Sequence, residues 1–244
     1  MKFLQDYYHE SANQFISVGA DQGSAFAKSV AGDFNPIHDA ESKRFCVPGD
    51  LLFAIALERY GLHEKMEFGF LDLLAADKPV VYPAVDLSTD SAQLEIVNEK
   101  DKPVVSIAWS GGLTLEAAKV EQMLRNYVAF SGQNFPHILV PLMEQHQVMI
   151  NPKRPLVIYE SMAFEFSTLE FEDLEIRLHD TRLEVDGRRG NAELLFELSS
   201  DGVNIGSGVK KLVLSGLRDY DQHAIQQMCD EYFASKDNYQ AAES

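Results

Sequence analysis

The chain has 244 residues, a hydrophobic content of 45%, a charged content of 24% and a formal net charge of −17. This composition is typical of an ordinary globular protein and argues against disorder. The negative charge repels phosphate backbones, so no nucleic-acid or membrane partner is expected. The first residues lack an export signal, and the apolar run Leu51–Leu57 falls far short of the roughly 20 residues that span a bilayer. These features predict a cytoplasmic protein.

The two cysteines, Cys46 and Cys229, are too few for a disulfide framework. No Cys-x-x-Cys or His-x-x-x-His pair offers a metal site, and no dinucleotide or phosphate-loop motif is present. Each cysteine is interpreted as a small buried hydrophobic residue. The sequence therefore predicts neither a metal nor a cofactor.

Two helices are expected in the first part of the chain, after a short strand within Asn13–Val18. The first covers Ala20–Ala31 and ends at Gly32, a residue suited to a left-handed C-terminal cap. The second covers Leu51–Tyr60 and ends at Gly61, and its first two turns are apolar on every face. A helix that is hydrophobic all round must be enclosed by protein, and a curved sheet is the economical enclosure.

Strands that could supply this sheet follow the second helix. They are rich in Val, Ile and aromatic residues, which favour extended structure. A polar cluster at 99–102 suits a hairpin turn between two of them. The expected strands are Val80–Leu87, Ala92–Asn98 and Val104–Ser110.

The second part of the chain returns to a helix and then to strands. The helix is expected around Leu115–Phe130, and a last amphipathic helix at Asp221–Ala234 is expected to pack on the outside. Asp186-Gly187 and Asp201-Gly202 are strong hairpin signals. The expected strands are Leu156–Phe166, Leu174–His179, Arg182–Val185, Ala192–Leu198 and Val203–Leu214.

A helix-plus-sheet unit therefore occurs twice, and the two copies share a short signature. The spacing Gly-Asp/Gln-x-x-Pro begins at Gly32 and again at Gly132. Four matched positions are a small basis for a repeat, and chance similarity between two helix-ending turns competes with duplication. We expect an N-terminal unit at 1–118 and a C-terminal unit at 119–244.

The segment at 31–39, Ala-Gly-Asp-Phe-Asn-Pro-Ile-His-Asp, is followed at 47–52 by Val-Pro-Gly-Asp-Leu-Leu. Together these segments resemble the signature of the MaoC-like hot-dog hydratases, which include the R-specific enoyl-CoA hydratases. The resemblance covers the turn and the helix start and points to a bacterial branch of that family. It implies an α+β hot-dog fold, an antiparallel sheet wrapped around a buried helix, and with the repeat it implies a double hot dog.

The resemblance also implies a lyase of fatty acid metabolism that acts on an acyl-CoA or acyl-carrier-protein thioester. Adding water across a conjugated double bond needs a base for the water and an acid for the α-carbon. Asp33 and His38 are the candidate catalytic pair. Pro36 restrains Asn35 to an extended conformation, so the turn can hold both groups on one side of a cleft.

Three further residues are candidates for substrate binding. Asn35 would brace the turn, and the backbone N–H of Gly49, at the start of the buried helix, would bind the thioester oxygen. Ala54 stands where the family often has a Ser within the helix. That difference removes one hydrogen bond, and Pro48 stands where the family has a His.

The second copy departs further from the family pattern. Gln133 replaces the carboxylate, and Gln cannot act as a general base, although His137 follows nearby. This half is expected to complete the sheet and shape the pocket. In the double hot-dog hydratases the working motif lies in the C-terminal half, so its N-terminal position here is a mismatch.

Several alternatives stay open from the sequence. Asp and Asn beside Pro are ordinary turn formers, and a single His after a turn is often a solvated surface residue. The same fold could support thioester hydrolysis, which would release a free thiol. It could also support a non-catalytic acyl-thioester binder or scaffold. Whether the chain is a homodimer is left open.

Overall fold

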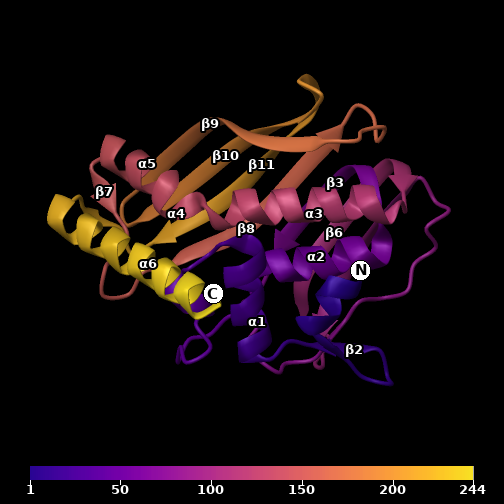
Figure 1. Cartoon of the computed structure of the whole chain (residues 1–244), viewed down its shortest axis with the longest axis horizontal. Helices are drawn as coiled ribbons and strands as arrows, with labels where there is room; N and C mark the ends of the chain where they lie inside the picture. The colour runs from indigo at the N-terminus through magenta and orange to yellow at the C-terminus, as the bar shows by residue number, and fades with distance from the viewer. Residues whose placement is uncertain (244) are drawn as a thin grey trace.

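The computed structural model describes residues 1–243 and is built on a ten-stranded, fully antiparallel sheet (Figure 1). The strand order is β1-β2-β4-β5-β6-β3-β8-β11-β10-β9, and β7 and β12 form a separate two-stranded sheet. The strands are β1 His9–Glu10, β2 Phe15–Ser17, β3 Leu62–Phe70, β4 Val80–Val81, β5 Ser91–Asn98, β6 Pro103–Thr114, β7 Val148–Met149, β8 Val157–Phe166, β9 Leu174–Asp186, β10 Arg189–Ser200, β11 Val203–Ser215 and β12 Arg218–Asp219.

Two helices, α2 and α3, run next to each other against the sheet, and α6 lies to their lower left in the view (Figure 1). The rings of Phe53 on α2 and Tyr127 on α3 lie 5.0 Å apart, edge to face, and both are fully buried. The helices are α1 Ala20–Phe26, α2 Gly49–Tyr60, α3 Ala117–Gly132, α4 Asn134–His137, α5 Leu139–Gln145 and α6 Gln222–Glu243, and single helical turns lie at Lys2–Asp6, Ala27–Ala31 and Pro36–His38.

Helix α2 is enclosed by protein, as its apolar sequence predicts. Every side chain in Leu51–Leu57 is buried, and the helix ends at Gly61 with φ of +76°. Gly32, which ends the turn after α1, likewise has a positive φ of +66°. The predicted α+β class and the antiparallel sheet packed against a buried helix are confirmed.

Each half of the sheet follows one of the two central helices with the same strand order. Strands β3 to β6 after α2 are ordered β3-β6-β5-β4, and strands β8 to β11 after α3 are ordered β8-β11-β10-β9. The halves meet where β3 and β8 pair, with Met66 opposite Phe164. The duplicated signature therefore coincides with a duplicated strand order.

Strand β3, at the centre of the sheet, was not predicted from the sequence. Its inward residues, Met66 and Phe68, alternate with the exposed Lys65 and Glu67, so the periodic signal extends over only four residues. A strand with one solvated face carries such charges without cost. The central position of β3 comes from its two long neighbours rather than from its own sequence.

Other strand boundaries also differ from the prediction. Only Val80–Val81 of the expected strand at 80–87 pairs with neighbours, and Pro83 follows, a residue that cannot continue a ladder. The expected strands at 174–179 and 182–185 are one strand, β9. Its register shifts where Leu195 faces Asp180 and Phe196 faces Leu178, leaving His179 in a bulge.

Helix α6 is nine residues longer than predicted at its C-terminal end, with most of its side chains exposed. One face nevertheless packs on the two signature turns. The hydroxyl of Tyr232 donates to the carbonyl oxygens of Gly32 at 3.1 Å and Gly132 at 3.5 Å. A helix expected to lie outside therefore joins the two signature turns.

Candidate functional site

The turn that carries the predicted catalytic pair is built by its own side chains. The Oδ1 atom of Asp33 accepts a 2.8 Å hydrogen bond from the backbone N–H of Asn35, and Oδ1 of Asn35 accepts one from Ile37 at 3.1 Å. Asn35 precedes Pro36 in an extended conformation (φ −64°, ψ 126°). These side chains are turn formers, but Oδ2 of Asp33 is left to face another group.

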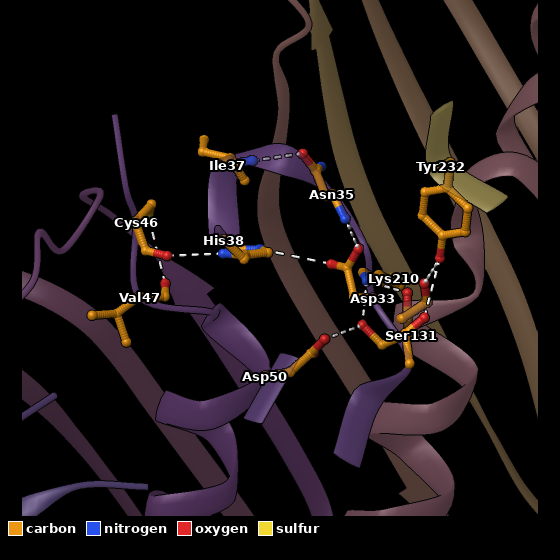
Figure 2. A network of polar contacts seen from close by, with 12 residues as sticks. Asp33, Asn35, Ile37, His38, Cys46, Val47, Asp50, Ser131, Lys210 and Tyr232 are labelled. Atoms are coloured by element: carbon orange, nitrogen blue, oxygen red, sulfur yellow. Dashed lines mark hydrogen bonds and ion pairs between the residues drawn. The ribbon is translucent and has the colours of Figure 1, made fainter. Parts of the chain in front are cut away.

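That other group is the imidazole of His38. Its Nε2 lies 3.7 Å from Oδ2 of Asp33, and its Nδ1 is 2.8 Å from the carbonyl oxygen of Cys46 (Figure 2). A carbonyl only accepts hydrogen bonds, so Nδ1 carries a proton and donates it. The neutral ring therefore presents the lone pair of Nε2 toward Asp33.

Asp33 and His38 both line a pocket of about 520 Å³, together with Asn35 and Gly49. The structure thus brings together four of the five predicted site residues. The fifth, Ala54, is fully buried inside α2 and is not among the residues that line the pocket. Its small side chain belongs to the helix packing.

Gly49 begins α2 at the pocket wall, where two aromatic rings cover it. A Cβ atom at this position would lie 3.0 Å from Cδ1 of Tyr159 and 3.1 Å from Cε1 of Phe70. Close approach of these rings is therefore the observed reason for a glycine here. From the sequence, its backbone N–H had been assigned to the thioester oxygen.

A second group of polar side chains in this pocket was missed by the sequence analysis. Asp50 of α2, Ser131 of α3 and Lys210 of β11 all line it and all are buried. Lys210 Nζ donates to Ser131 Oγ, and Ser131 Oγ donates to Asp50 Oδ2 at 2.6 Å (Figure 2). The available signal was a carboxylate at the start of an otherwise apolar helix, which needs a partner when buried.

Burial shifts the titration of both charged members of this group. Loss of solvent raises the pKa of the Asp50 carboxyl above its ordinary value, against the opposing attraction of Lys210. Loss of solvent likewise lowers the pKa of the Lys210 amine, although Asp50 opposes the change. Lys210 also lies 4.2 Å above the ring of Tyr159, whose hydroxyl is hydrogen-bonded to that of Tyr127.

Gln133 and His137 of the second signature line a different groove of about 570 Å³, together with residues of β9. The ring of His137 packs 5.9 Å from that of Phe233. Gln133 brings no carboxylate to His137. The second signature turn therefore lacks the acid that Asp33 supplies in the first.

Cys46 and Cys229 are both buried and free. Burial raises the pKa of the Cys46 thiol to about 11, which makes it a poor source of thiolate. Within residues 1–243, no three His, Cys, Asp or Glu side chains are grouped so that they could hold a metal ion. The helices described in the same range are all too short or too polar to cross a bilayer.

Comparison with solved structures finds neighbours of low sequence identity. A structure described as a putative thioesterase II from Thermobifida fusca has a TM-score of 0.49 at 7% identity, covering 86% of this chain and 96% of that one. The acyl-CoA thioesterase II from Mycobacterium marinum has a TM-score of 0.41 at 10% identity, covering 90% and 98%. A MaoC-like dehydratase has a TM-score of 0.44 at 9% identity, covering 86% and 98%.

Among curated proteins, no sequence matches this chain. One family model matches residues 2–223, which is most of the chain and includes both signature turns. The match also spans Asp50, Ser131 and Lys210. The chain therefore belongs to the family described as protein of unknown function (DUF3581).

Proposed function

We propose that the chain is a double hot-dog protein that hydrates or dehydrates the acyl thioester of coenzyme A or of a carrier protein, as MaoC-like enzymes do. The two units are residues 1–118 and 119–244, and a cytoplasmic location is part of the proposal. The repeated strand order after α2 and after α3 supports the two-unit description. The observation that carries the activity is the 3.7 Å approach of Asp33 and His38 at the wall of the pocket.

The geometry gives each member of the pair a role. Because Nδ1 of His38 donates to Cys46, the neutral ring can take a proton from water only at Nε2. The imidazolium formed there faces the carboxylate of Asp33, which stabilises its charge. The imidazolium then gives this proton to the α-carbon, which leaves the ring neutral, and in dehydration it returns the proton to the leaving hydroxyl group.

The pocket is suited in size and lining to an acyl chain with one reactive end. Its volume of about 520 Å³ lies in the range of small-molecule sites. Leu52, Leu74 and Ile150 line it alongside the polar residues of the turn. These apolar side chains would cover the acyl chain of the substrate. The turn from Asp33 to His38 would lie beside the carbon atoms that react.

The test is the hydration of short enoyl thioesters by the wild type and by Asp33→Asn. We expect the variant to stay folded and to lose activity by about 10²- to 10⁴-fold, the usual contribution of an acid–base group. Asp39→Asn is the matched control, because Asp39 lines the same pocket but pairs with Lys28 at 2.9 Å. Equal turnover by Asp33→Asn and the wild type would reject the assignment, and release of free thiol would indicate thioester hydrolysis instead.

A further inference from the structure

Ser131, Lys210 and Asp50 form a buried chain of hydrogen bonds that the hydration chemistry does not use. Lys210 Nζ donates to Ser131 Oγ, and Ser131 Oγ donates to Asp50 Oδ2 at 2.6 Å. The exposed fractions of the three residues are 4%, 4% and 8%, yet each contributes to the lining of the pocket. A hydroxyl held between an amine and a carboxyl is the arrangement of a nucleophile with a base and an orienting group.

We propose that Ser131 is a nucleophile that accepts an acyl group from an acyl thioester or ester, with Lys210 as its general base and Asp50 as the residue that positions them. The proposal takes its substrate class from the proposed function but does not depend on hydration at Asp33 and His38.

The base role requires an uncharged amine, and the chain of hydrogen bonds provides one. Moving one proton from Lys210 to Asp50 through Ser131 reverses both bonds. Asp50 then donates to Ser131, and Ser131 donates to the amine of Lys210. Burial favours this neutral state, because it lowers the pKa of Lys210 and raises the pKa of Asp50.

When Lys210 takes the proton of Ser131, its surroundings stabilise the new cation. The amine lies over the electron-rich face of Tyr159 at 4.2 Å and 3.5 Å from the carbonyl oxygen of Ser131. That carbonyl belongs to the last turn of α3, where the helix dipole favours positive charge. These contacts offset part of the cost of burying the cation.

The oxygen of the attacked carbonyl also has a place to develop charge. Ser131 is hydrogen-bonded to the side chain of Asp50, which belongs to the first turn of α2. The first backbone N–H groups of a helix, here those of Gly49 and Asp50, have no partner within the helix. In the proposed reaction these groups would stabilise the negative charge that develops on the carbonyl oxygen, as an oxyanion hole does.

The reaction balances with water as the only co-reactant. Ser131 Oγ forms a bond to the acyl carbon as the carbon–sulfur bond breaks, and its proton passes through Lys210 to the leaving thiolate. The products are an acyl-serine and a free thiol. Water, deprotonated by Lys210, then attacks the acyl-serine and releases the carboxylic acid and the restored hydroxyl.

The competing explanation is that these hydrogen bonds only hold two parts of the molecule together. Asp50 comes from the N-terminal half of the chain, and Ser131 and Lys210 come from the C-terminal half. Such a structural role does not need a reactive hydroxyl. Reaction with an electrophile that modifies activated serines, but not ordinary ones, therefore separates the two explanations without any substrate.

The experiment treats the full-length protein with a short-chain alkyl fluorophosphonate and locates the adduct by peptide mass spectrometry. We expect one adduct, on Ser131, in the wild type. The labelling rate should fall by about 10²-fold or more in Lys210→Met, since an acid–base group contributes 10²- to 10⁴-fold. Asp50→Asn/Lys210→Met removes both charges, so it guards against loss of fold and should be equally slow.

Ser42→Ala is the matched control, because Ser42 lines the same pocket and should not affect labelling. Labelling is measured without any enoyl thioester, so a failure of the hydration proposal leaves this result unchanged. Absence of an adduct on Ser131 in the folded wild type would overturn the proposal. A folded double variant that is labelled as fast as the wild type would also overturn the proposal.

Discussion

Gly132 packs its Cα atom against the carbonyl oxygen of Ala31, so that a Cβ atom at position 132 would overlap that oxygen. Ala31 directly precedes the glycine of the first signature, and Gly132 is the glycine of the second. The turns of the two halves are therefore in direct contact at the edge of the pocket. Ser131, which precedes Gly132, hydrogen-bonds to Asp50 at the same place.

The first prediction concerns this contact. Gly132→Ala should destabilise the protein by about 1–3 kcal/mol or more, because the backbone of one signature turn would have to move. Urea unfolding measures the change. Gly19→Ala is the control, since a Cβ atom there would lie no closer than 3.4 Å to a neighbour. Equal stability of the two variants would contradict the close packing.

The second prediction concerns the hydroxyl of Tyr232. Tyr232→Phe keeps the ring but removes the donor to the carbonyl oxygens of Gly32 and Gly132, and should cost about 1 kcal/mol. The ring contact with Phe34, at 5.9 Å, should persist. Chemical denaturation measures the loss, and a variant as stable as the wild type would show that water replaces the hydroxyl.

The third prediction compares the loss of stability when one member of the buried Asp50–Lys210 pair is replaced with the loss when both are replaced. Lys210→Met should destabilise the protein by about 3–5 kcal/mol, because Asp50 would be left buried without its partner. The double variant Asp50→Asn/Lys210→Met should regain most of that loss. Thermal and urea unfolding measure both variants. A double variant no more stable than the single one would contradict the coupling.

The fourth prediction concerns the protonation of His38. Because Nδ1 donates to the carbonyl of Cys46, the neutral ring should be the Nδ1–H tautomer rather than the form more common in solution. Nitrogen chemical shifts of the neutral imidazole, measured by NMR, report this directly. A proton on Nε2 would remove the proposed base from the side of Asp33.

The fifth prediction is an acid sensitivity that arises far from the pocket. His63 is fully buried, its ring stacks 4.9 Å from that of Trp109, and burial lowers its pKa below the ordinary 6.5. The unfolded chain therefore binds this proton at a higher pH than the folded chain does. The contribution of neutral His63 to the free energy of unfolding is fully present above about pH 6.5. It decreases as the pH falls toward the lower pKa that His63 has in the folded state.

The measurement is unfolding free energy against pH for the wild type and His63→Phe, which keeps a stacked ring without a titrating group. The difference between the two curves isolates His63 from the other histidines. We expect the wild type to lose stability faster below pH 6.5. Parallel curves would show that folding leaves the pKa of His63 unchanged and would contradict the prediction.

The sequence by itself determined the features that depend on local physics. Gly32 and Gly61 end their helices because only glycine readily adopts a positive φ, and the run Leu51–Leu57 requires enclosure because water would contact apolar groups on every side. The Asp33-to-His38 turn was also predictable, because Asn35 and Pro36 restrict the backbone between them.

Tertiary structure alone decided which distant residues share the pocket. Asp50, Ser131 and Lys210 lie on three elements separated by about 80 positions from one to the next, and each looks ordinary in its own segment. The central strand β3 was missed for the same reason, since its place comes from pairing with β6 and β8. Buried charges and strand neighbours are set by long-range contacts, whose energies depend on the folded environment rather than on local sequence.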